Sequence, residues 1–175
     1  RNTIIYFQFR EERKMKTVSN GDTFVNQITP TTKQNYIYNI DYPAGRFITL
    51  KTRFQFSTYR FNSVFTKGYV LLQDISASVS KFNFSLRYAV FNTNNYDNRQ
   101  YVYERDVLYA FSIPAYSGIG SRFYFVIQYK FNKKFQIQSK YSFTNYRDRS
   151  TISSGNEEIT GNLKQDVKLQ LKFSF

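Results

Sequence analysis

The sequence predicts an all-β fold built from antiparallel strands, and three observations support this. Apolar and polar residues alternate with a period of two in one segment after another, whereas the helical period of 3.6 is almost absent. Phe and Tyr, which favour strands, make up 20% of the 175 residues. Turn-forming residues such as Pro43 and Gly45 stand between the alternating segments.

The first three predicted strands alternate most regularly. In residues 5–10 every second side chain is apolar, and the side chains between them are polar or aromatic with a hydroxyl. Residues 36–42 and 48–56 repeat the pattern, and the short turn 43–45 joins them. Two alternating runs joined by a short turn predict an antiparallel pair.

The next four predicted strands are shorter or less regular. Residues 67–75 contain three consecutive apolar residues, whereas 81–90 alternate throughout. Residues 100–103 form a short sixth strand, and 107–113 form a seventh that stops at Pro114, because proline cannot donate a hydrogen bond to a strand ladder.

The last three predicted strands are residues 122–131, 134–143 and 167–175. In the final one every second residue is apolar, the residues between include two lysines, and the run ends at an aromatic residue, Phe175. Successive side chains of a strand point to opposite faces, so this strand has one wholly apolar face and one polar face. The outward and lumenal faces of an outer-membrane β-barrel strand differ in this way.

The repetition of this pattern predicts an antiparallel transmembrane β-barrel with about ten strands in this chain, either complete or part of a larger barrel. The mean hydropathy is −0.54 and no run of about 18 apolar residues exists, which excludes a transmembrane helix but not barrel strands. We treat residues 1–175 as one domain, or as the C-terminal portion of one. Since the chain begins at Arg1 without a signal peptide, we expect a mature product or a piece of a longer protein.

Alternation assigns side chains to the two faces of the predicted barrel. The residues expected to face lipid are Phe54, Phe56, Phe84, Leu86, Phe125, Ile127, Ile137, Leu169, Leu171 and Phe173. The basic residues expected to face the lumen are Arg10, Lys51, Arg53, Arg87, Arg122, Lys130, Lys140, Lys168 and Lys172. Tyrosines near strand ends are candidates for interfacial girdles or for loop packing: Tyr42, Tyr59, Tyr116 and Tyr146.

Connection lengths agree with a barrel, whose periplasmic turns are short and whose extracellular loops are longer. If Phe175 ends on the periplasmic side, the turns on that side are short and the connections on the other side are long. The short turns are 43–45, 76–80 and 132–133, and the long connections are 11–33, 91–99 and 147–162. This alternation requires Glu104-Arg105-Asp106 to be a tight turn between two strands.

Residues 97–116 and 118–124 resemble the C-terminal part of a family of Bacteroidota outer-membrane proteins labelled helix-hairpin-helix domain-containing. Residues 67–75 and 157–162 are also similar to that family, and the resemblance covers about residues 49–175. It implies a barrel that is the C-terminal portion of a larger protein. The family's helix-hairpin-helix part is absent here, so no residue of this chain supports a DNA-related role.

Composition argues against catalysis and against nucleic-acid binding. The chain has no His and no Cys, which removes the usual general base, the Ser-His pair and the commonest zinc ligands, so we expect no enzyme, no cofactor and no metal site. The net charge of +13 suits an anionic partner. However, a single-strand binder needs aromatic and basic side chains on one face, and here they alternate on opposite faces.

The expected function is therefore that of an integral outer-membrane β-barrel of a Gram-negative bacterium, acting as a channel or as a scaffold subunit of an envelope complex. Its partners would be outer-membrane lipid and other envelope proteins. A basic lumen would favour anions or hold an acidic plug; alternatively, its charges pair across strands. The other hypothesis is a soluble all-β binding module with a basic surface, in the periplasm or outside the cell, whose aromatic side chains pack against a second sheet.

Overall fold

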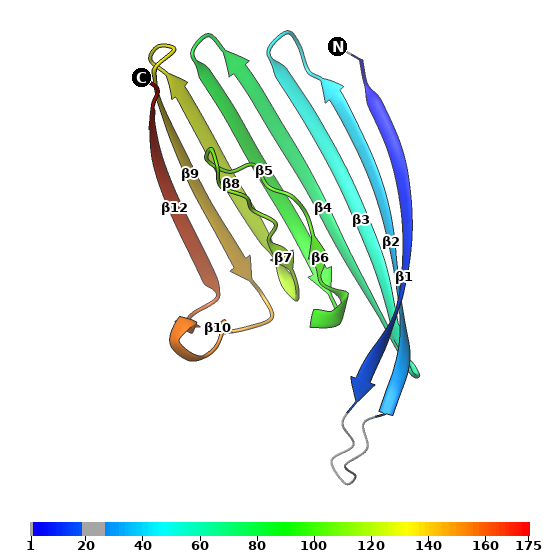
Figure 1. The fold of residues 1–175 in the computed structure, drawn as a ribbon. Helices are drawn as coiled ribbons and strands as arrows, with labels where there is room; N and C mark the ends of the chain where they lie inside the picture. Colours follow the sequence, from blue (N-terminus) through cyan, green and yellow to red (C-terminus); the bar gives the residue numbers. More distant parts are fainter. Residues whose placement is uncertain (1, 19–26) are drawn as a thin grey trace.

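The computed structural model describes residues 2–18 and 27–175, which form one large antiparallel sheet (Figure 1). Eight strands pair in the order β1-β2-β3-β4-β5-β8-β9-β12. Their bounds are β1 Ile4–Val18, β2 Gln27–Pro43, β3 Ile48–Phe61, β4 Val64–Val79, β5 Phe82–Thr93, β8 Ile119–Lys130, β9 Phe135–Tyr146 and β12 Leu163–Phe173. The all-β antiparallel prediction is thus confirmed, and each strand of the sheet pairs with the strand of the sheet that follows it along the chain.

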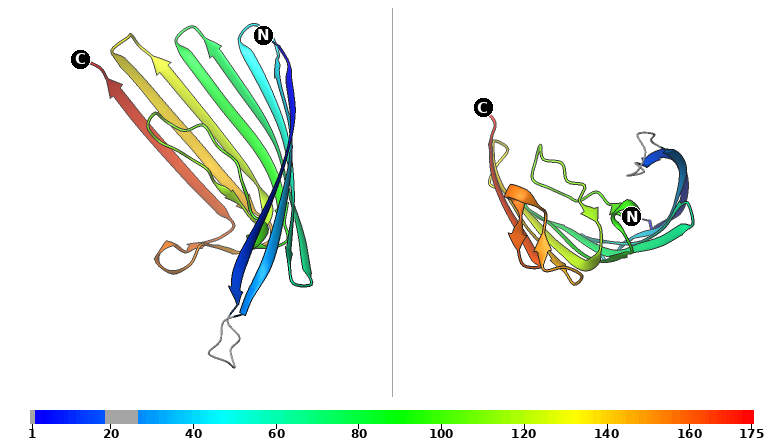
Figure 2. Two further views of the ribbon diagram at one scale, coloured as in Figure 1. Left: turned by 45° about the vertical axis from the view of Figure 1, so that its right-hand side comes forward. Right: turned by 90° about the horizontal axis from the view of Figure 1, so that it is seen from below.

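The sheet is curved into an open trough (Figure 2). Strands β1 and β12 form its two edges: within the described residues β1 pairs with β2 alone and β12 with β9 alone. Closure into a barrel is therefore not seen. The strands are long, 11 to 17 residues, and several extend well beyond the predicted alternating runs.

Most short turns lie at one end of the sheet, together with both chain termini (Figure 1). The β2–β3, β4–β5 and β8–β9 turns lie at this end, as the sequence predicts. At the opposite end, β3 and β4 are joined by a tight turn in which Asn62 has a φ of 53°. The long loop predicted at 11–33 is wrong in extent, because β1 continues to Val18 and β2 begins at Gln27, and the residues between them lie outside the described part.

The connection between β5 and β8, residues 94–118, is the largest departure from the prediction. Residues 100–103 and 107–113 are not strands of the sheet. Only Gln100–Tyr101 (β6) pairs, with Ala115–Tyr116 (β7), and Glu104 forms a single bridge with Ser112. The proposed tight turn at 104–106 is also wrong, because the chain turns at Val107–Ala110 instead.

We call residues 94–118 the inserted segment, because they fold back over the concave face of the sheet (Figures 1 and 2). The segment begins with a short 3-10 helix, η1 Tyr96–Asn98, whose N-cap Asn95 accepts a hydrogen bond from the Asn98 amide. A second short excursion between β9 and β12 contains β10 Thr151–Ile152, η2 Gly155–Glu157 and β11 Ile159–Thr160. The predicted strands 100–103 and 107–113 are absent from the sheet, and β5 pairs directly with β8. Because two strands are lost together, the short turns and the long connections still lie at the ends of the sheet where the sequence predicts them.

Candidate functional site: the charged concave face

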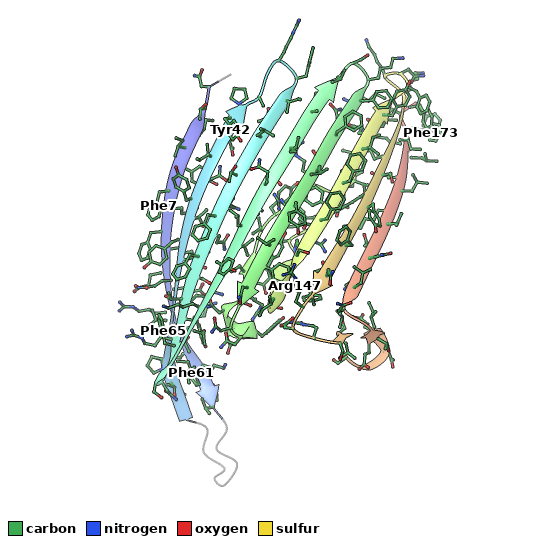
Figure 3. All side chains as sticks on the ribbon, turned by 180° about the vertical axis from the view of Figure 1, so that it is seen from behind. Phe7, Tyr42, Phe61, Phe65, Arg147 and Phe173 are labelled. Carbon is green, nitrogen blue, oxygen red and sulfur yellow. The ribbon has the colours of Figure 1, made fainter. Side chains whose placement is uncertain are left out.

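The two faces of the sheet differ sharply in chemistry, because directly opposed residues of antiparallel strands share a face and successive residues alternate. The ten residues predicted to face lipid all lie on the convex face, where several lie opposite apolar residues of the neighbouring strand, for example Phe54 opposite Leu71 and Phe84 opposite Ile127. Many apolar side chains there are open to the surroundings: Phe7 is 65% exposed and Leu169 is 69% exposed. Figure 3 shows this face, with Phe7 and Tyr42 toward one edge of the sheet and Phe173 near the other.

Aromatic rings follow one another across the convex face at the short-turn end. Phe82 and Tyr129 have ring centroids 4.5 Å apart, Tyr129 and Phe131 4.5 Å, Phe131 and Phe135 4.6 Å, and Phe135 and Phe173 4.5 Å. This ring belt, as we call it, spans four strands from β5 to β12. Such offset and edge contacts are the favoured arrangements of aromatic pairs.

The nine basic residues predicted to face the lumen all lie on the concave face. Several pair with acids of neighbouring strands, which was one of the two expected outcomes. Lys51 Nζ lies 3.2 Å from an Asp41 carboxylate oxygen. Arg87 donates two hydrogen bonds to Asp74, of 2.5 and 2.7 Å, and both side chains are largely buried. A fork of this kind fixes geometry as well as charge.

The other acids come from the inserted segment, and Glu104 is the most central. Its side chain is fully buried, and it accepts hydrogen bonds from Arg122 Nε at 2.6 Å and Nη2 at 2.9 Å. Lys140 Nζ lies 3.4 Å from the second carboxylate oxygen, and the Tyr116 hydroxyl donates to the first at 3.2 Å. Arg122 also donates to the Thr144 hydroxyl. Glu104 thus links the inserted segment to strands β8 and β9.

Asp106 extends this network toward β12. Its buried carboxylate lies 2.8 Å from Lys168 Nζ and 3.2 Å from Lys140 Nζ, and it also accepts from the Val107 amide. Burial alone would raise the pKa of Asp106, but the hydrogen bonds from Lys168 and Val107 and the charge of Lys140 hold the pKa below its ordinary value. The carboxylate is therefore charged at neutral pH and pairs with two lysines of the sheet.

Further hydrogen bonds attach the inserted segment along its length. Arg87 donates to the Tyr103 carbonyl at 2.7 Å, and Arg105 donates to the Ser85 hydroxyl at 2.7 Å. Gln170 of β12 donates to the Leu108 carbonyl at 2.7 Å. Backbone groups of a segment outside the main sheet are thereby satisfied by concave side chains.

An apolar cluster anchors the segment at the centre of the trough. Val102 and Tyr116 of the segment pack on four concave residues of β4 and β5: Val70, Leu72, Ala89 and Phe91. Gly120 of β8 allows Phe91 to lie close to the backbone, because a Cβ on Gly120 would lie 2.5 Å from the Asn145 carbonyl oxygen and 2.8 Å from the Phe91 ring.

Three of the four tyrosines considered for girdles or for loop packing are interior residues. Tyr116 is buried in the cluster just described, Tyr146 packs against that cluster, and Tyr59 is buried on the concave side of β3. Only Tyr42 lies on the convex face, opposite Leu50. The rings that do line one end of the convex face are mostly phenylalanines, and neighbouring strand ends bring them together in a way that a single strand's pattern does not show.

The remaining predicted basic residues are less constrained. Arg10 lies near Glu12 of its own strand, and Arg53 donates to the Tyr6 hydroxyl. Lys130 and Lys172 form no ion pair with an acid of the described residues, although the Lys172 ammonium lies 5.6 Å from the centre of the Tyr109 ring. The concave face is thus tightly paired beside the inserted segment and more open toward the β1 edge and toward the short turns.

Within the part of the chain that the structure describes, no helix is long and apolar enough to cross a membrane. Within the same residues, no three acidic side chains come together as metal ligands. Comparison of the chain with protein-family models, with curated proteins and with solved structures gives no match. The family suggested by the sequence resemblance of residues 49–175 therefore stays a prediction.

Proposed function

We propose that this protein is an integral outer-membrane β-barrel, or a large part of one, whose convex face contacts lipid. The observation that supports this most strongly is the absence of charge from the convex face of the eight strands between the short-turn end and the level of Phe9, Phe56 and Tyr69. From Tyr69 to Val79 on β4, for example, no convex side chain is charged, and the same holds from Leu163 to Phe173 on β12. In the strands that the structure describes, the charged convex residues lie beyond this level, toward the long-loop end: Glu11, Arg13, Arg60 and Lys67.

The size of this uncharged region suits a membrane. It spans 11 residues on β4, which at about 3.3 Å per residue and a tilt of about 40° covers a height of roughly 25 Å, the apolar thickness typical of outer-membrane barrels. The ring belt at the short-turn end lies where barrels place interfacial aromatic side chains.

The distribution of charge agrees with the same proposal. Arg87 and Lys140 are buried on the inner side of the sheet, while Leu169 and Phe7 lie open on the outer side. A protein surrounded by water would gain by the opposite arrangement. The soluble module considered above requires a second sheet over the aromatic face, and the described residues contribute no such sheet.

The complete barrel contains more than eight strands under this proposal. Eight strands enclose an interior that side chains alone can fill, whereas this concave face holds the whole inserted segment with its own backbone. The free edges of β1 and β12 also require partners, because unpaired backbone groups are not tolerated in lipid. Additional strands between β12 and β1 meet both requirements.

We assign the barrel a scaffold role in an envelope complex, rather than that of an open channel. Glu104 and Asp106 hold the inserted segment across the lumen through three basic residues of the sheet, and Val102 and Tyr116 pack it on the wall. A lumen occupied by a bonded segment leaves little free cross-section. The outer membrane of a Gram-negative bacterium is the proposed location, in line with the resemblance to Bacteroidota outer-membrane proteins.

Fractionation of the native protein tests the proposal. We expect recovery only from the outer-membrane fraction after detergent extraction, and a gel mobility that shifts on boiling, as for folded barrels. Recovery in the soluble fraction without detergent would refute the membrane proposal and support the soluble binding module.

A further inference from the structure

On the basis of the proposed function, we infer that two basic side chains of the β3–β4 hairpin bind the phosphate group of a membrane lipid at the long-loop end of the convex face. They are Arg60 of β3 and Lys67 of β4. Phe56 and Tyr69, which lie opposite each other, end the uncharged region of these two strands, and the two basic residues are the first charges beyond it. If the uncharged region spans the apolar core of the membrane, lipid headgroups lie at this level.

The two basic residues lie close together on one face of the hairpin. Arg60 lies opposite Phe65, and Lys67 follows Phe65 by two residues on β4. Such diagonal neighbours on antiparallel strands are about 7–8 Å apart. The Arg60 guanidinium carbon lies 5.8 Å from the centre of the Phe65 ring, and the Lys67 ammonium lies 5.6 Å from it. Both charges therefore gather around one ring, which Figure 3 shows toward the end of the sheet opposite the short turns.

No acid of the described residues neutralises these two cations. Both side chains are exposed, and neither forms a hydrogen bond or ion pair with another described residue. Glu11 is the one convex acid of the described strands, and it already lies 2.7 Å from Arg13 Nε. Asp74 is the only acid on β3 and β4, and it is paired on the concave face. Two positive charges are thus available to an anion at this place.

An apolar surface leads from the two cations toward the short turns. Tyr69, Leu71 and Phe54 follow on the convex face of the same two strands, and each is 42 to 44% exposed. A hydrocarbon chain that lies along these side chains would bring its headgroup to the level of the cations.

A lipid with a phosphate group fits both parts of this surface. Arginine can bind a phosphate through two parallel hydrogen bonds, and lysine adds a compact charge. Free phosphate lacks the hydrocarbon chain that the apolar surface would cover, and a neutral lipid lacks the charge. Basic side chains at a membrane surface attract anionic lipids in this way.

Native mass spectrometry of the full chain in a nonionic detergent tests this inference with three probes: dioleoyl phosphatidic acid, dioleoylglycerol and inorganic phosphate. We expect phosphatidic acid to bind at least tenfold more tightly than either of the others. The double variant Arg60→Gln, Lys67→Gln should weaken phosphatidic acid binding at least tenfold, since each basic residue contributes roughly fivefold. Its binding of dioleoylglycerol should not change.

The matched control is the double variant Arg10→Gln, Lys130→Gln, which removes the same two charges from the concave face and should leave phosphatidic acid binding unchanged. Circular dichroism establishes that each variant is folded before titration. Four results would overturn the inference: no binding of phosphatidic acid, equal affinity for dioleoylglycerol, equal affinity for inorganic phosphate, or unchanged phosphatidic acid binding by the Arg60→Gln, Lys67→Gln variant. Any of these would leave the fractionation result standing, whereas recovery of the native protein in the soluble fraction would refute the proposed function itself.

Discussion

At the scale of single residues, the concave face depends on two acids that the sequence pattern placed wrongly. The sequence predicts that Glu104 and Asp106 belong to a tight turn, because residues 104–106 are all charged and apolar residues flank them. In the structure both carboxylates are buried among Arg122, Lys140 and Lys168. Nothing in the local sequence distinguishes an acid in a turn from an acid that faces basic side chains of distant strands.

Glu104→Gln should destabilise the fold strongly, because it removes one charge from a buried network, leaves Arg122 without its acidic partner and leaves Lys140 with Asp106 alone. Removing one partner of a buried ion pair costs about 3–5 kcal/mol. Denaturant unfolding in detergent, followed by circular dichroism, measures the loss. Glu157→Gln, at an exposed residue of η2, is the control and should change the free energy of unfolding little. A loss below about 1 kcal/mol for Glu104→Gln would contradict a central role for this carboxylate.

Asp106 should make stability depend on pH in the acid range. The pKa of Asp106 in the folded protein lies below its ordinary value of 3.8, so its contribution is fully present above that value and is lost as the pH falls through the folded pKa. Asp106→Asn should therefore be less stable than wild type at pH 7, and the difference should shrink below pH 3.8. Unfolding measured at several pH values checks this. A difference that stays constant with pH would be inconsistent with the lysine contacts.

At the scale of elements, period-two alternation located all eight strands of the sheet but not their ends. Strand β1 runs eight residues beyond the predicted end at Arg10, because there the pattern becomes polar on both faces while the backbone ladder with β2 continues. Residues 107–113 show the opposite error. Their alternation predicts a strand, whereas Tyr109 has a φ of 63° and the segment lies against side chains instead of joining a ladder.

The inserted segment should control conductance. Replacing residues 95–117 with Asn-Gly, a turn that joins antiparallel neighbours directly, leaves β5 and β8 able to pair. Under the barrel proposal the complete protein should conduct little in planar bilayers, and this deletion should open the lumen. Replacing residues 153–158 with the same turn is the control and should not change conductance. A deletion variant that inserts into bilayers but stays closed would contradict the plugging role.

At the scale of the whole molecule, the chain has a polar interior and an apolar exterior. Alternation within each strand predicted which side chains share a face, because in-register pairing of eight strands extends the local pattern across the sheet. It did not predict the ring belt or the buried carboxylates, because each of these brings together residues from several elements of the fold. The open edges at β1 and β12 were not predicted either, because the pattern within one strand does not specify which strands pair with each other.

Accessibility of single cysteines in native membranes tests lipid contact by the convex face most directly. The chain has no cysteine, so Leu169→Cys on the convex face and Ser78→Cys on the concave face each provide the only thiol. We expect a water-soluble maleimide to label Ser78→Cys but not Leu169→Cys, and a lipid-soluble thiol reagent to label Leu169→Cys. Equal labelling of both positions by the water-soluble reagent would contradict burial of the convex face in lipid.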